Sequence, residues 1–80
     1  MDITRSDFMM FTPAQVRDFA MERAGLDKED ADLLVKHKVN GSRLLGSTVG
    51  EAKALYDLPG GSAKALFDML AATFPGEESI

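Results

Sequence analysis

Signals that begin and end helices recur along the chain and constrain its fold more than any other feature. Thr12 is followed by Pro13 and Gln15, which supplies an N-cap residue, a favoured first helical residue and the third residue of a capping box. Thr48 and Glu51 repeat the capping box later in the chain. Because Gly and Pro separate these starts, each helix can extend for only a few turns.

Five helices are expected, with no strand. The first helix covers residues 13–24 and is ended by Gly25, and the second follows Asp27 and reaches Lys38. A single helical turn has Ser42 as its cap, and a short helix follows Thr48. A longer last helix begins at Ser62 and stops at Pro75 and Gly76. Apolar residues at helical spacing form the expected core: Val16, Phe19, Ala20, Ala24, Ala31, Leu34, Val35, Ala52, Leu55, Leu66, Phe67, Leu70 and Phe74. Tyr56 and Met69 are expected to be partly buried. The sequence therefore predicts an all-α fold, a compact five-helix bundle with a longer C-terminal helix.

One domain is expected, over residues 11–75. The 80 residues are too few for two independent cores. Residues 1–10 lie outside the helical pattern but contain Phe8, Met9 and Met10, which are costly to leave in water. These residues are therefore expected to form an ordered N-terminal arm laid over the bundle, while residues 76–80 form a flexible acidic tail.

The composition excludes most enzyme chemistry. The chain has no cysteine, and His37 is its single histidine, so thiolate catalysis, cysteine-rich zinc sites and relays of several histidines are excluded. Lys36 and Lys38 flank His37 and oppose cation binding. Asp18 and Glu22 are four residues apart, but they fall on the polar side of a helix and indicate a solvated face. We expect no enzymatic activity, no cofactor, no metal and no small-molecule substrate.

The sequence gives no sign of a membrane or secreted protein. No apolar run approaches the roughly 18 residues that span a bilayer. The first residues lack the basic segment and long apolar core of a secretory signal. The expected location is intracellular, in the cytoplasm or nucleus, with no membrane partner.

A stretch in the middle of the chain carries a family resemblance. Leu34 is followed by a four-residue gap, Val39, Asn40, Gly41 and then a pair of leucines at 44 and 45. Together with Val16 and Phe19, Gly25–Leu26, Thr48–Leu55 and Gly61–Leu70, this order resembles the sterile alpha motif (SAM) domain family over residues 11–74. The resemblance implies a five-helix fold and a protein–protein interaction module of signalling or scaffold proteins, which mediates oligomerisation with itself or with another SAM-like domain.

The resemblance also implies a head-to-tail contact, in which the start of the last helix docks on the middle helices of the next copy. A helix start with exposed N–H groups can receive a carboxylate. Charge is segregated accordingly, with −3 over residues 27–32 and +3 over residues 36–64. The expected partner-binding residues are Gly60, Gly61, Ser62 and Lys64 at the helix start, and Asp27, Glu29, Asp30, Asp32 and Glu51 on the middle surface. Helix capping and dipole preference alone would also select these acidic residues, so a purely structural role stays open.

Nucleic-acid binding is the alternative. The loop from Pro59 to Lys64 is similar to the glycine-rich turn of helix-hairpin-helix modules, and Lys36, Lys38, Arg43 and Lys53 could extend a basic face. That motif places its glycines two residues apart, whereas Gly60 and Gly61 are adjacent. The net charge of −4 also has the wrong sign for a protein that grips nucleic acid over its whole surface. Protein partners are therefore favoured.

Overall fold

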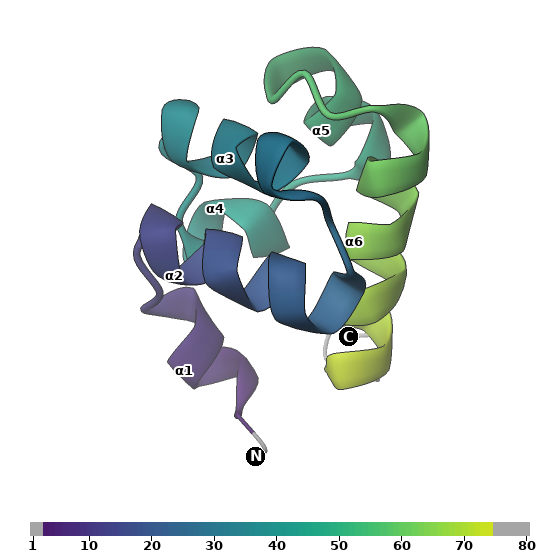
Figure 1. Ribbon diagram of the computed structural model, residues 1–80. Coiled ribbons are helices and arrows are strands. Elements are labelled where there is room, and N and C mark those ends of the chain that lie inside the picture. Colours follow the sequence, from purple (N-terminus) through teal and green to yellow (C-terminus); the bar gives the residue numbers. More distant parts are fainter. Residues whose placement is uncertain (1–2, 75–80) are drawn as a thin grey trace.

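The structure is a computed structural model that describes residues 3–74, and they form an all-helical bundle without strands (Figure 1). The helices are α1 (Arg5–Met9), α2 (Pro13–Phe19), a π-helical turn η1 (Ala20–Ala24), α3 (Lys28–Lys36), α4 (Gly41–Leu45), α5 (Val49–Leu55) and α6 (Gly60–Thr73). The predicted all-α class and the longer last helix are confirmed. The expected stop at Pro75 and Gly76 and the tail over 76–80 lie outside the described residues.

The capping boxes work as the sequence predicts. Gln15 N donates to Thr12 Oγ1 at 3.3 Å, and Thr12 N donates to Gln15 Oε1 at 2.9 Å. Thr48 and Glu51 exchange the same pair of bonds at 2.9 and 3.1 Å. Gly25 has a φ of 73°, the left-handed conformation expected where the first long helical segment ends. Local chemistry therefore sets these three boundaries.

Two other helix starts differ from the prediction. Ser42 does not cap α4, because Asn40 lies at the N-cap and its Oδ1 accepts from Arg43 N at 2.7 Å. Asp27 occupies the N-cap position of α3, as expected, but its carboxylate makes no capping bond. Asn and Ser are both strong N-cap residues, and α4 is capped by Asn40, two positions before Ser42.

The expected N-terminal arm is a helix in its described part. Thr4 and Asp7 form a capping box, in which Asp7 N donates to Thr4 Oγ1 at 3.0 Å and Thr4 N donates to Asp7 Oδ2 at 3.2 Å. Phe8 on this helix is fully buried, whereas Met9 and Met10 are 42% and 83% exposed. Of the three apolar residues, only Phe8 enters the core, and it lies within the bundle rather than over it.

Phe8 is the centre of a group of four aromatic rings. Its ring centroid lies 5.1 Å from that of Phe11, 5.3 Å from that of Phe19 and 5.6 Å from that of Phe74. These separations fall in the range of favourable aromatic pairs, about 4.5–7 Å. The four rings join α1, α2 and the C-cap of α6, so segments from both ends of the described chain meet at Phe8.

Helix α1 rests directly on the start of α4. Gly41 is buried, and a Cβ atom at this position would overlap the backbone carbonyl of Phe8. Gly41 N also donates to the carbonyl oxygen of Phe11 at 3.0 Å. The two backbones approach so closely that only glycine fits at this position.

At the end of α5 the exposure of two side chains differs from the prediction. Leu55, predicted to be in the core, is 52% exposed, and Tyr56, predicted to be partly buried, is 1% exposed. Helix α5 ends at Leu55, and the chain then turns so that the Tyr56 ring points inward with its hydroxyl 2.6 Å from Ser47 Oγ. The predicted partial burial of Met69 is confirmed. Four other predicted core residues are only partly buried: Phe19, Ala24, Val35 and Phe67.

Replacement of Phe8 tests whether it anchors the bundle. Phe8→Ala should lower the free energy of unfolding by about 3–5 kcal/mol, because it removes a buried ring and leaves a cavity. Urea denaturation followed by circular dichroism measures this loss. Met10→Ala, at a side chain that is 83% exposed, is the matched control and should change stability by less than about 0.5 kcal/mol. Equal effects of the two substitutions would contradict the anchoring role.

A glycine pair tests the contact between α1 and α4. Gly41→Ala should destabilise the fold by about 1–3 kcal/mol or more, since the new methyl group forces α1 away from α4. Gly50→Ala provides the comparison, because the nearest atom to its added Cβ would be Thr48 Oγ1 at 3.8 Å. Gly50 lies in α5, so alanine there should be neutral or stabilising by up to about 1 kcal/mol. Thermal melts of both variants would reveal the difference, and similar melts would argue against the close contact.

Candidate functional site

The starts of α3 and α6 meet through a hydrogen bond. Ser62 Oγ donates to Asp30 Oδ2 at 2.6 Å, and both side chains are partly buried. Asp30 lies in the first turn of α3, and Ser62 lies in the first turn of α6. The two groups of residues expected to bind each other across neighbouring copies therefore touch within one molecule.

The backbone at the start of α6 is open to solvent. The helix begins at Gly60, two residues before the predicted cap, and Ser62 donates to Asp30 instead of capping the helix. Gly60 and Gly61 are exposed, and a Cβ at Gly61 would meet nothing within 4 Å. At Gly60 the nearest atom would be the end of the Lys53 side chain, at 3.8 Å. A partner could therefore approach this helix start closely.

Lys64 is exposed and paired within its own helix. Its Nζ lies 2.7 Å from Asp68 Oδ2, one helical turn away. The hydrogen bond and charge of Asp68 raise the pKa of Lys64 above its ordinary value. Lys64 therefore carries its positive charge throughout the neutral pH range.

Some carboxylates of the predicted acidic surface are bonded to other groups of the chain, and others face solvent. Asp32 binds Lys28 Nζ at 2.8 Å, and Glu51 is held in the capping box of α5. Asp27 and Glu29 are exposed and form no ion pair with any other residue in the described part of the chain. Asp30 accepts only from the uncharged Ser62 hydroxyl, so the carboxylates of residues 27–32 that have no cationic partner in the described part of the chain are Asp27, Glu29 and Asp30.

Of the basic residues in the predicted alternative, only Lys53 and Lys64 lie at the start of α6. Lys36 and Lys38 lie at the end of α3, which runs away from α6 to the opposite side of the bundle (Figure 1). The Arg43 guanidinium lies 5.5 Å from the centre of the Tyr56 ring. The end of the Lys53 side chain lies near Gly60. The positive charge is thus distributed over several parts of the bundle.

His37 has a structural partner. Its Nε2 lies 3.1 Å from Asp57 Oδ2, and its ring centroid is 6.4 Å from that of Tyr56. Asp57 has a φ of 62°, so this contact forms at a turn in the left-handed region. Within residues 3–74 no group of three potential ligand side chains could hold a metal ion.

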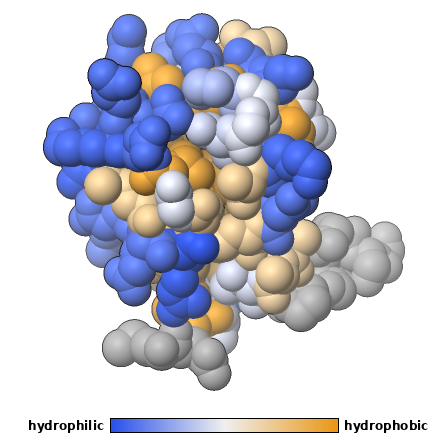
Figure 2. All heavy atoms as spheres, turned by 45° about the vertical axis from the view of Figure 1, so that its right-hand side comes forward, coloured by the Kyte–Doolittle hydropathy of each residue, from blue (hydrophilic) through white to orange (hydrophobic). Residues whose placement is uncertain are grey.

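The outward side of α6 is poor in charge. Over its 14 residues only Lys64 and Asp68 are ionisable. Ala71 and Ala72 are exposed, and Met69 is partly buried. Figure 2 brings the α6 side of the molecule forward and shows an apolar area there with hydrophilic side chains at its edges.

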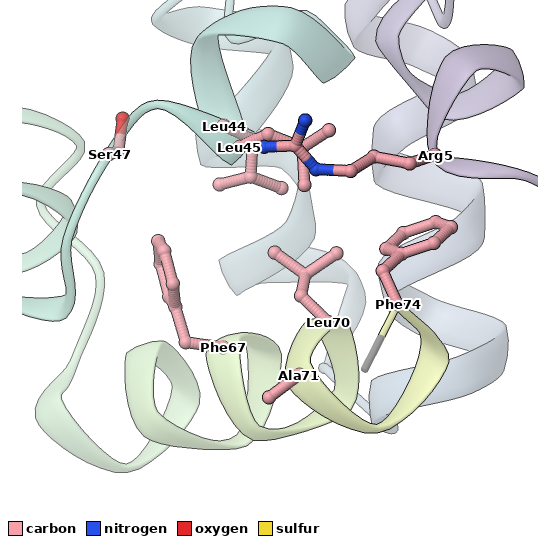
Figure 3. A pocket seen from close by; sticks show the side chains of 8 residues that line it. All are labelled: Arg5, Leu44, Leu45, Ser47, Phe67, Leu70, Ala71 and Phe74. Carbon is pink, nitrogen blue, oxygen red and sulfur yellow. The ribbon is translucent and has the colours of Figure 1, made fainter. Parts of the chain in front are cut away.

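A pocket that the sequence did not suggest lies between α1, α4 and α6 (Figure 3). Its volume is about 220 Å³. Most of the lining is apolar, and the residues are Leu44, Leu45, Phe67, Leu70, Ala71 and Phe74, with Arg5 and Ser47 as the polar members. Arg5 is partly buried, and its guanidinium extends beside Leu44 and Leu45 on the side of the pocket that faces α6 (Figure 3).

The pocket was missed because its residues come from three separate segments. Arg5 belongs to the residues expected to form an arm, and no periodic pattern includes it. The capping box that Thr4 forms with Asp7 was the sequence feature that could have indicated that Arg5 lies on a helix. Nothing in the local sequence indicates that α1 lies beside α4 and α6.

A double-mutant cycle tests the bond between α3 and α6. Ser62→Ala and Asp30→Ala should each lower the free energy of unfolding by about 1–2 kcal/mol, as expected for a partly buried bond to a charged group. The double variant should lose about 1 kcal/mol less than the sum of the two. Urea denaturation measures all three, with Ser42→Ala at an exposed serine as the neutral control. Strict additivity would contradict the bond.

Comparison with known proteins identifies no relative. No family model, no curated protein and no solved structure matches this chain. No helix in residues 3–74 is long and apolar enough to cross a membrane. The chemistry of the helix surfaces and of the pocket is therefore the basis on which a function can be inferred.

Proposed function

We propose that this chain is a protein-interaction module of the SAM kind whose contact helix is α6. The observation that carries the proposal is the outward side of α6, which has one ion pair and otherwise small or apolar side chains over 14 residues. A helix that is apolar nearly all round is normally covered on every side. A protein partner would cover the side of α6 that the bundle leaves open.

The order of helices supports the comparison with SAM domains. After α1, a capped helix begins at Pro13, short helices follow, and the longest helix comes last. Gly41 and Leu44, which carry part of the resemblance, are buried where α4 meets the rest of the bundle. Helix α1 is an addition to the five helices that the resemblance implies.

A second copy of this chain is the partner that α6 fits. Lys64 and Asp68 are four residues apart, so an antiparallel pair of α6 helices would place Lys64 of each copy near Asp68 of the other. Ala72 on the outward side is small enough for two helices to approach closely. Helix α6 is therefore complementary to itself in charge, and the small side chain of Ala72 permits a close approach of a second helix.

The size of this contact indicates weak association. A helix of 14 residues is about 21 Å long, and a contact along one such helix buries less than the roughly 1,200 Å² of a stable interface. We expect a dissociation constant above about 10 μM. Regulated or transient pairing is consistent with this range.

A closed pair is favoured over an open head-to-tail chain. Ser62 already binds Asp30 of its own molecule, and the two predicted surfaces are adjacent rather than opposite. Open chains require complementary surfaces that face in different directions. The carboxylate of Asp30, which contacts Ser62 in the first turn of α6, also disfavours the nucleic-acid alternative, because it would repel phosphate groups at that helix start.

Charge reversal tests the proposed pairing. Lys64→Glu and Asp68→Lys should each weaken self-association roughly tenfold, since each places like charges together twice in a symmetric pair. A mixture of the two variants should regain association, because Glu at position 64 of one copy then meets Lys at position 68 of the other. Sedimentation equilibrium at low and high salt measures these constants, and high salt should weaken the wild-type pair.

The control for this experiment is Lys36→Glu. It makes the same change of charge at an exposed lysine on α3 and should leave self-association unchanged. A wild-type protein that remains monomeric at millimolar concentration would refute the self-association proposal. Loss of association in the control as well would indicate a general effect of net charge.

A further inference from the structure

We infer that the pocket between α1, α4 and α6 binds a peptide segment that carries one large apolar side chain next to a carboxylate. This inference adds a second surface, and a partner other than a second copy, to the proposed self-association. It depends on three properties of the pocket, which are its size, its one available cation and its rigid support.

The size of the pocket suits one side chain. A dry cavity of about 150 Å³ lined by Leu and Phe side chains admits a benzene ring, whereas pockets for drug-sized ligands and cofactors measure about 300–1,000 Å³. With about 220 Å³, this pocket holds a phenylalanine or leucine side chain but no long acyl chain and no cofactor. Phe67, Leu70 and Leu45 supply the apolar contacts for such an anchor (Figure 3).

Arg5 supplies the recognition of charge. No acidic side chain in residues 3–74 forms an ion pair or hydrogen bond with its guanidinium, although the side chain is partly buried. The other polar group in the lining is occupied, since Ser47 Oγ lies 2.7 Å from the Arg43 carbonyl oxygen and 2.6 Å from the Tyr56 hydroxyl. A guanidinium pairs best with a carboxylate, through two parallel hydrogen bonds.

The position of Arg5 fixes the spacing in the ligand. Its guanidinium lies directly across the pocket from Leu70 and beside Leu44 and Leu45 (Figure 3). A side chain in the pocket and a carboxylate on Arg5 must therefore belong to neighbouring residues of one segment. Exposed Ala71 continues the apolar surface of α6 at the pocket and leaves space for the peptide backbone.

The pocket is rigidly supported before any ligand binds. Arg5 lies on α1, which is held by the capping box at its start, by the buried ring of Phe8 and by the close contact with Gly41. Preorganised groups bind more tightly because less conformational entropy is lost on binding. The anchoring of α1 thus places Arg5 over the pocket.

A pair of peptides tests the inference. The probes are two hexapeptides, Ser-Gly-Phe-Glu-Gly-Ser and Ser-Gly-Phe-Gln-Gly-Ser, each acetylated at the N-terminus and amidated at the C-terminus, titrated into the full chain and followed by amide chemical shifts in NMR. The first should bind about tenfold more tightly, with the largest shifts at residues that line the pocket. Arg5→Gln should abolish the difference between the two peptides. Equal affinity of the wild-type chain for both would overturn the inference.

Two adjacent alanines provide a matched pair of variants. Ala71→Phe places a ring at the pocket and should weaken binding at least tenfold, whereas Ala72→Phe, outside the lining, should retain it. Both positions are exposed, so both variants should fold. Equal effects of the two substitutions would place the binding elsewhere and overturn the inference.

Two further measurements distinguish a separate peptide partner from a second copy and from a segment of the same chain. The same titration of Lys64→Glu, which should not pair with itself, should give an unchanged peptide affinity, so that failure of self-association leaves the peptide result intact. Peptide binding that appears only after removal of residues 75–80 would overturn the inference, because the occupant would then be a segment of this chain.

Discussion

The burial of Phe8 among three other aromatic rings is the interaction on which the rest of the structure depends. It joins the first helix to α2 and to the end of α6, and thereby links the two ends of the described chain. In a bundle with such short helices, no helix is stable alone, so packing between them must supply the stability. The same anchor holds α1 against Gly41 and so positions Arg5 over the pocket. The fold and the pocket therefore share one physical cause.

The two sides of helix α6 differ in their surroundings. Its inward side contributes Leu66 and Leu70 to the core, while its outward side carries little charge. At its start, the bond between Ser62 and Asp30 ties α6 to α3 and brings residues of both predicted surfaces together. The net charge of −4 conceals this arrangement. What matters for a partner is which charges stay open after the internal bonds are made.

Features that depend on neighbours in the sequence were predictable. The capping boxes at Thr12 and Thr48 and the left-handed conformation of Gly25 depend only on residues within one helical turn. They can therefore be predicted from the local sequence. The prediction failed where packing decides between similar local choices. Leu55 and Tyr56 are adjacent and both apolar in part, and the turn after α5, with the bond of Tyr56 to Ser47, decided which one is buried. Helix α1 was missed because its box has aspartate in place of glutamate or glutamine.

The sequence by itself determined that this chain is helical, where α2, α3 and α5 begin and which residues form much of its core, because capping and periodicity are local properties. Only the tertiary structure decided that Asp30 and Ser62 meet, that Lys36 and Lys38 lie away from α6, and that Arg5 closes one side of an apolar pocket. These relations join residues far apart in the chain. They follow from the angles at which short helices pack, which depend on side chains from all of them at once.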